Sequence, residues 1–222
     1  MSIDKPIVKT IVCLANSRKN GGLCVAGKEL DGYAGWIRPV SVRKGEEVSR
    51  EECRYENGEY PQLLDVIDVP LIKSNPQFHQ RENWLLNPNF RWKKSGRMHW
   101  RDLGSLTDPV SPLWIDESSG RNDRIVPSLI NVLNDSLRFV RVDKLNLLVS
   151  QHKYVRGKFW YNDKEYDISV TDTECERIYL KKPSGNYHIR NNFLTVSIGP
   201  PFNGYCYKFI AAVIPCNKTS GT

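Results

Sequence analysis

Short apolar runs separated by glycine, proline and asparagine recur along this chain and constrain its fold more than any other feature. In the first third of the chain they occupy residues 7–15, 23–30, 35–40 and 62–70. β-Branched residues are frequent in these runs, and Asp31-Gly32 between two of them is a hairpin turn signal. We therefore expect an all-β fold in which this part of the chain forms a small antiparallel barrel or sandwich.

A second group of apolar runs begins near residue 136 and continues almost to the end of the sequence. Residues 158–172 form two runs around the turn-forming pair Asn162-Asp163. Two strong runs follow at 191–199 and 205–215. This pattern predicts a second β-rich unit.

The stretch 78–126 differs from both groups. It holds four of the six tryptophans among Asn, Pro and Arg residues and shows no clean strand alternation. We predict an irregular connector with one or two short helices, and either a helical turn or a loop at 128–136. The expected domains are a first barrel at 1–80, a Trp-rich connector packed on the barrels at 81–135, and a second barrel at 136–222.

Charge and cysteine content limit the partners and the compartment. Of 222 residues, 32 are Lys or Arg and 25 are Asp or Glu, a formal net charge of +7. A basic chain favours polyanionic partners such as nucleic acid, although many basic proteins bind none. The N-terminal apolar run is too short for a signal peptide, no stretch approaches the roughly 20 apolar residues that cross a bilayer, and the cysteine spacing matches no zinc pattern. We expect a cytoplasmic protein with reduced thiols, no metal, no cofactor and no membrane partner.

The segment 16–22 is the sharpest candidate binding site. Asn16, Ser17, Arg18 and Lys19 lead into paired glycines between two expected strands. Backbone N–H groups exposed at glycine, beside hydroxyl, amide and cationic side chains, suit an anionic oxygen such as that of phosphate. The spacing is not that of a P-loop, and the alternative is a solvated hairpin turn.

Trp36 and Arg38 form a second candidate. An arginine beside an aromatic residue near a strand edge can stack on a base or pair with a phosphate. The alternative is a Trp36 in the barrel core and a solvated Arg38. Strand alternation places both side chains on one face, which argues against a wholly buried Trp36.

The segment around residues 79–83 is rich in hydrogen-bonding groups. His79 and Glu82 could form an acid–base pair, with Gln80 and Asn83 beside them. A single His and Glu lack the third, orienting group of a catalytic triad. The alternative is that these side chains only satisfy a loop.

A basic and aromatic run in the second half has the composition of a base-stacking platform with phosphate-neutralising cations. It includes Tyr154, Arg156, Lys158 and the aromatic residues at 159–161. A basic β protein with aromatic residues inside and lysines outside has the same composition. The sequence does not separate the two.

Five segments taken in order resemble the prokaryotic dual OB-containing domain family. They read NSRKNGGLCVAG, GWIRPVS, HQREN, SVTD and LTVSIGPPFNGYCYKFIAAVI, and they span Ile11 to Ile214. The resemblance implies two OB-like barrels packed together and a role in binding or sensing nucleic acid in bacterial conflict or defence systems. It lends no catalytic residue. The matching positions are Asn16, Ser17, Lys19, Gly22, Gly27, Trp36, Arg38, Pro39, His79, Gln80, Glu82, Asn83, Thr171 and Asp172.

Three functions follow as hypotheses. The first is a nucleic-acid-binding module in which Arg18, Lys19 and Arg38 contact phosphate while Trp36 or Trp84 stacks on a base. The second is an enzyme that acts on a nucleotide or nucleic acid. The third is an interaction subunit that docks to an effector protein through an exposed apolar patch at 159–161. For the first, we expect the segments around residues 16–22, 38 and 79–83 to share one cleft between the barrels.

Overall fold

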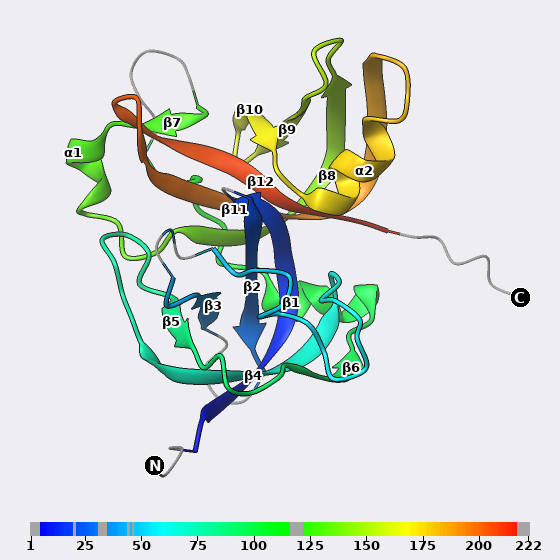
Figure 1. Ribbon diagram of the computed structural model, residues 1–222. Helices are drawn as coiled ribbons and strands as arrows, with labels where there is room; N and C mark the ends of the chain where they lie inside the picture. Colours follow the sequence, from blue (N-terminus) through cyan, green and yellow to red (C-terminus); the bar gives the residue numbers. More distant parts are fainter. Residues whose placement is uncertain are drawn as a thin grey trace, which may run out of the picture. The chain divides into compact units, whose positions relative to one another are not determined.

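The computed structural model describes residues 5–19, 21–30, 35–43, 45, 47–115 and 122–216. The chain divides into two compact units, Met1–His99 and Trp100–Thr222. Figure 1 shows the strands of the first unit in blue to green and those of the second in green to red.

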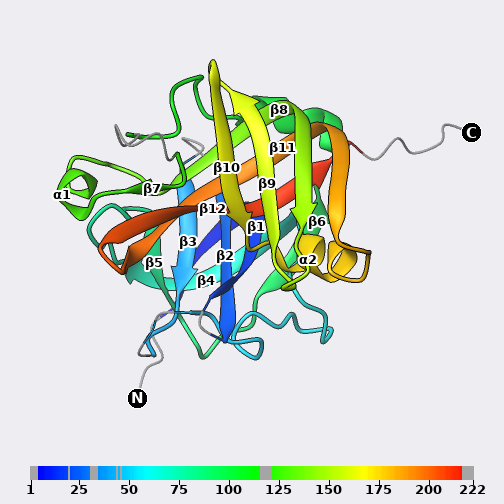
Figure 2. The same ribbon diagram turned by 90° about the horizontal axis from the view of Figure 1, so that it is seen from above.

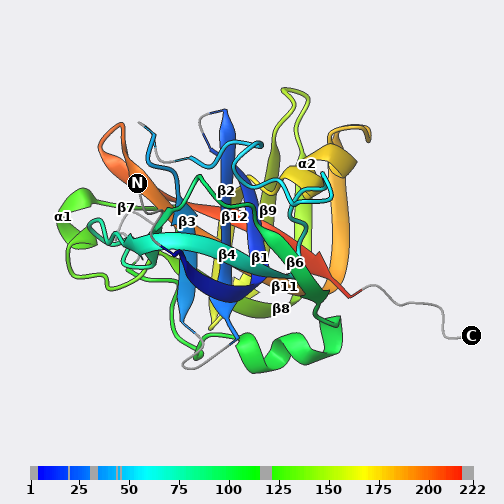
Figure 3. The same cartoon turned by 60° about the horizontal axis from the view of Figure 1, so that its bottom comes forward.

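The first unit is a closed five-stranded barrel. Its strands are β1 (Ile7–Lys19), β2 (Gly22–Glu29), β3 (Trp36–Val40), β4 (Asp65–Ser74) and β5 (Asn83–Leu86). They lie in the order β1-β2-β3-β5-β4, and β4 pairs back with β1 to close the barrel. The pairing of β3 with β5 is parallel, and the others are antiparallel. Figure 3 shows β4 running alongside β1 toward a short additional strand, β6 (Lys93–Arg97).

Alternate residues of these strands fill the first barrel. Ile11, Val25, Ile37 and Ile67 all lie in one buried apolar cluster. The β1 and β2 backbones come very close at Gly27. A Cβ atom built on Gly27 would lie 2.0 Å from the carbonyl oxygen of Val12. Only glycine permits this approach without a backbone shift.

The second unit is also a closed five-stranded barrel. Its strands are β8 (Leu137–Val149), β9 (Val155–Tyr161), β10 (Lys164–Val170), β11 (Gly185–Phe202) and β12 (Tyr205–Pro215). Figure 2 shows β10, β9 and β8 side by side. A parallel pairing of β10 with β12 closes the barrel. In both units, therefore, the third strand pairs in parallel with the fifth, and the fourth pairs with the first.

A short helix lies between the third and fourth strands of the second barrel. This helix, α2 (Thr173–Tyr179), begins after Asp172, whose carboxylate accepts hydrogen bonds from the N–H groups of Glu174 at 2.9 Å and Cys175 at 3.0 Å. The same carboxylate accepts a 2.7 Å bond from the N–H of Val213 in β12. Asp172 thus caps the helix and ties it to the barrel.

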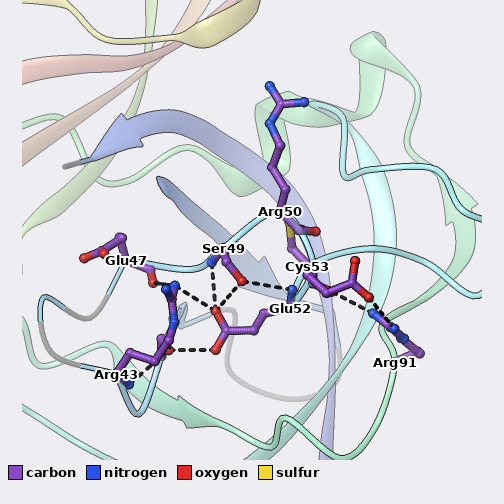
Figure 4. A network of polar contacts seen from close by, with 9 residues as sticks. Arg43, Glu47, Ser49, Arg50, Glu52, Cys53 and Arg91 are labelled. Atoms are coloured by element: carbon purple, nitrogen blue, oxygen red, sulfur yellow. Dashed lines mark hydrogen bonds and ion pairs between the residues drawn. The ribbon is translucent and has the colours of Figure 1, made fainter. Parts of the chain in front are cut away.

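The corresponding place in the first barrel is residues 41–64, and its described residues form a polar network and no regular helix (Figure 4). The Glu52 carboxylate accepts hydrogen bonds from the hydroxyl of Ser41 at 2.7 Å and from the hydroxyl and N–H of Ser49, each at 2.8 Å. Arg43 forms an ion pair with Glu52 at 3.0 Å. Burial alone raises the pKa of Glu52, but these hydrogen bonds hold it below its usual value.

The all-β fold class and the two barrels are confirmed, and the connector contains short helices in its described residues, as expected. The first barrel extends beyond residue 80, because β5 hydrogen-bonds to β3 and β4. Two short helices lie in the connector, the 3₁₀ helix η1 (Trp100–Leu106) and α1 (Pro127–Ile130), and a two-residue strand, β7 (Arg124–Ile125), pairs with β12. The predicted turn at Asp31-Gly32 lies outside the described residues. No helix in the described part of the chain is long and apolar enough to cross a bilayer.

Candidate functional site

The predicted basic loop at 16–22 is mostly strand. Asn16 to Lys19 are the last residues of β1, and they pair in register with β2 as far as Lys19 opposite Gly22. Only residues 20 and 21 separate the two strands, and Asn20 lies outside the described residues. The loop prediction was wrong because the ladder continues to the turn. Arg18 is exposed, Ser17 is buried, and the Asn16 side chain donates a 2.8 Å hydrogen bond to the carbonyl of Pro61.

Arg38 and Glu82 are brought together in the first barrel. The Arg38 guanidinium lies 2.7 Å from the Glu82 carboxylate, and the N–H of Arg38 donates a 2.8 Å hydrogen bond to the Glu82 carbonyl. Arg38 is only 3% exposed, so it does not project into solvent as the sequence-based hypothesis required. Its guanidinium is already paired with the Glu82 carboxylate.

The segment 79–83 forms a turn that begins β5. Gln77 and Gln80 exchange two backbone hydrogen bonds of 3.1 and 2.7 Å, and the intervening Phe78 has a positive φ of 47°. The side chain of Asn83 donates to Gln80 at 3.3 Å. His79 and Asn83 are buried. These hydrogen bonds agree with the alternative that the side chains of this segment satisfy the polar groups of a loop. The ion pair with Arg38 gives Glu82 a structural role.

Trp36 is half-buried, as the alternation argument predicts. Its ring centroid lies 5.6 Å from the ammonium of Lys28, which is 4% exposed. Trp36 pairs with Lys28 at the end of β2, whereas Lys19 pairs with Gly22 at its start. Six residues of extended strand separate these points by about 20 Å. The structure therefore joins two of the three predicted segments, and a cleft shared by all three stays a prediction.

The second barrel carries a more exposed set of binding side chains. On β9, Arg156, Lys158 and Trp160 alternate outward, while residues 155, 157 and 159 are buried. Trp160 is 65% exposed. Across the neighbouring strands, Lys158 lies in a row with Asp167 on one side and Asn146 and His188 on the other.

We call this surface the β9 face. It comprises Trp160 and the residues that line a depression of about 340 Å³, namely Asn146, Leu148, Arg156, Lys158, Asp167, Asn186 and His188.

A second depression of about 500 Å³ adjoins the β9 face, with which it shares Arg156, Lys158 and Asp167. We call it the arginine depression, and its lining residues are Asn122, Asp123, Arg124, Arg156, Lys158, Glu165 and Asp167. Its cations are paired with carboxylates. Arg124 lies 3.0 Å from Asp123, and Lys158 lies 2.9 Å from Glu165.

Aromatic side chains border the arginine depression at Arg124. The Arg124 guanidinium carbon lies 5.0 Å from the ring centroid of Tyr205 and 5.1 Å from that of Tyr207. Phe202, before the two-residue turn that joins β11 to β12, is 64% exposed. The arginine depression therefore has the Arg124 guanidinium and an exposed aromatic side chain, Phe202, near it.

The connectivity of each barrel now has a counterpart among known proteins. A family model described as the dual OB-containing domain matches residues 9–213. The chain belongs to the dual OB-containing domain family. The resemblance drawn from the sequence is therefore confirmed, and no curated protein matches the chain.

An OB barrel binds its ligands across the second and third strands and the loops that join strand one to two and strand four to five. In the second OB barrel these are β9, β10 and residues 150–154 and 203–204. Arg156, Lys158, Trp160 and Asp167 of the β9 face lie on these two strands, and its other residues lie on β8 and β11. In the first OB barrel the two loops are residues 20–21 and 75–82, which adjoin Lys19 and contain His79 and Gln80.

The sequence contains a local signal for the β9 face, although the candidate sites named from the sequence all lie in the first barrel. Arg156, Lys158 and Trp160 recur at every second position, which places them on one side of a strand. The contribution of Arg124 had no local signal, because its partners Tyr205 and Tyr207 lie more than 80 residues away in the sequence.

Proposed function

We propose that this dual OB protein binds single-stranded nucleic acid across the β9 face of its second barrel. The observation that carries the proposal is the outward alternation of Arg156, Lys158 and the 65%-exposed Trp160 on the second strand of an OB barrel. Stacking on an aromatic ring and neutralisation of phosphate by neighbouring cations are the two components of single-strand binding.

A single strand fits this face better than a duplex. Trp160 can stack only on a base whose plane is accessible, and paired bases hide their planes inside the helix. Asn146, Asn186 and His188 add hydrogen-bonding groups that can reach base edges or sugar hydroxyls. The test therefore includes both DNA and RNA.

The first barrel supplies secondary contacts in this proposal. Arg18 is exposed, and Lys19 lies next to the loop that OB barrels use for ligands. We also propose nucleic-acid contacts for the other candidate residues of the first barrel: Asn16, Ser17, Trp36, Arg38, His79, Gln80, Glu82 and Asn83. A role in a bacterial conflict or defence system, in the cytoplasm, is part of the same proposal and rests on the family resemblance.

Fluorescence anisotropy with labelled single strands of about 15 nucleotides, as DNA and as RNA, tests the proposal at low salt. Trp160→Ala should weaken binding by roughly tenfold or more, because stacking on one aromatic side chain contributes about 1–3 kcal/mol. Tyr60→Ala is the matched control, since Tyr60 is an exposed aromatic residue of the first unit. Wild-type affinity in Trp160→Ala, or no binding by the wild type, would refute the proposal.

A docking surface for an effector protein is the second candidate. Leu148, Tyr154 and Trp160 are 41%, 45% and 65% exposed, which gives the second barrel exposed apolar side chains on and beside the β9 face. Co-elution with the products of neighbouring genes on size-exclusion chromatography tests this candidate. Loss of the complex in Trp160→Ala, with no nucleic-acid binding by the wild type, would favour docking over nucleic-acid binding.

A further inference from the structure

Two arginines converge on one carboxylate in the arginine depression. Asp123 accepts hydrogen bonds from Nε of Arg124 at 3.0 Å and from its terminal nitrogen at 3.4 Å. Arg156 approaches the same carboxylate at 3.7 Å. The Asp123 and Arg124 side chains are each 16% exposed, and that of Arg156 is 27% exposed. The three charges therefore meet where solvent still enters.

Contacts other than Asp123 position both arginines. The Arg124 guanidinium makes cation–π contacts with the rings of Tyr205 and Tyr207. Nε of Arg156 donates to Asp167 at 2.6 Å, and one of its terminal nitrogens donates to the hydroxyl of Ser169 at 3.2 Å. Each guanidinium would keep its position if a different anion replaced the Asp123 carboxylate.

We infer that Asp123 occupies a phosphate site, and that a phosphate group of the bound nucleic acid takes its place between Arg124 and Arg156. The choice of nucleic acid as the source of that phosphate rests on the proposed function. The forked donors of arginine match the oxygens of phosphate as well as those of a carboxylate, and a phosphate offers more acceptor positions. Asp123 thus competes with the ligand and lowers its affinity.

The position of the site agrees with a strand that crosses the β9 face. Arg156 and Lys158 line both depressions, so a backbone whose phosphates contact these two cations also borders the arginine depression. The exposed Phe202 on the bordering hairpin offers a further stacking surface to a base next to the bound phosphate.

The first test compares Asp123→Asn with Asp143→Asn in the anisotropy assay. Both changes remove one negative charge from the second barrel, but only Asp123 lies between the two arginines, and Asp143 is exposed on β8 outside both depressions. Asp123→Asn should tighten binding at least about threefold, and Asp143→Asn should not. The side-chain change leaves the Asp123 carbonyl free to accept its 2.8 Å hydrogen bond from Lys208. An equal gain in both variants would show a general charge effect and overturn the inference.

The second test needs no nucleic acid. Inorganic pyrophosphate should raise the melting temperature of Asp123→Asn, and the additional change Arg124→Gln should remove that rise. The same response with and without Arg124 would overturn the site. If pyrophosphate stabilises Asp123→Asn through Arg124 but no variant binds a single strand, the phosphate site stands and the proposed function fails. If the wild type binds through Trp160 and Asp123→Asn binds no tighter, the proposed function stands and the inference fails.

Discussion

Arg38 and Glu82 form a 2.7 Å ion pair whose two side chains are only 4% and 5% exposed. Their backbones are also joined, because the N–H of Arg38 donates to the carbonyl of Glu82. The pair therefore fixes β3 against the start of β5. Charge reversal at Arg38 is therefore expected to lower the melting temperature.

Arg38→Ala should lower the free energy of unfolding by about 3–5 kcal/mol, because it leaves the Glu82 carboxylate buried without its cation. Arg38→Glu should cost more, since it adds a second carboxylate. Urea denaturation monitored by tryptophan fluorescence measures both. Arg18→Ala, at an exposed position of β1, should change stability by no more than about 0.5 kcal/mol. The double variant Arg38→Met, Glu82→Leu should recover most of the loss, and its failure to do so would show that Arg38 contributes more than charge pairing.

Gly27→Ala tests the close approach of β1 and β2. The added methyl group would lie 2.0 Å from the Val12 carbonyl oxygen, so the backbone must shift, at a cost of about 1–3 kcal/mol or more. Gly96→Ala is the matched control in β6, because its nearest neighbour would be a Val66 side-chain atom at 3.7 Å. Thermal denaturation should show a clear loss for the first change and almost none for the second. Equal melting temperatures would contradict the strand spacing described here.

The strands that local sequence predicts are those with long apolar runs. β1 and β4 carry β-branched side chains in series, and β2 and β3 are short apolar runs with one or two of them, so the conformation of these strands follows from neighbours in sequence. The four residues of β5 carry no such series, and their pairing with β3 and β4 decides their conformation. Helix α2 was not predicted, because its seven residues make only about two turns and show no recognisable helical periodicity.

The site was less predictable than the fold because burial depends on distant residues. Alternation correctly places Trp36 and Arg38 on one face of β3, but it cannot show that Glu82, 44 positions later, meets Arg38. On β9 the same alternation is sufficient, since Trp160 remains exposed. The position of a strand within an OB barrel depends on which distant strands it pairs with. The sequence of that strand alone does not reveal it.

Asp172 should make the stability of the second barrel depend on pH. Burial raises its pKa from 3.8 to about 6, although the N–H groups of Cys175, Val213 and Glu174 oppose the rise. The native state therefore takes up a proton more readily than the unfolded chain. The resulting stabilisation is complete below the unfolded pKa and is lost as the pH rises through about 6, with a full amplitude of about 3 kcal/mol.

Urea denaturation of wild type and Asp172→Asn, between about pH 4 and pH 7, measures this dependence. The asparagine cannot ionise, so its curve should lack the fall in stability seen for the wild type. Its amide oxygen can still cap the helix. In Asp143→Asn, at an exposed position on β8, the free energy of unfolding should depend on pH as it does in the wild type. If the stability of Asp172→Asn fell with pH as that of the wild type does, the pH dependence would belong to another group.

The salt dependence of binding separates a localised site from general attraction to a basic protein. The arginine depression contains three cations, Arg124, Arg156 and Lys158, and an equal number of carboxylates. If these cations make the phosphate contacts, the plot of log affinity against log salt should have a slope of about −2, from roughly 0.7 per single-strand phosphate. Diffuse contact that used the whole net charge of +7 would give about −5.

Two variants make the salt measurement specific to this surface. Lys158→Gln should make the slope shallower by about 0.7, because one phosphate contact is lost. Lys93→Gln, an exposed lysine on β6, should leave the slope unchanged. Anisotropy titrations at several salt concentrations give each slope. Equal slopes in both variants, or a wild-type slope near −5, would mean that the single strand is held by scattered surface cations and not by the side chains that β9 presents beside Trp160.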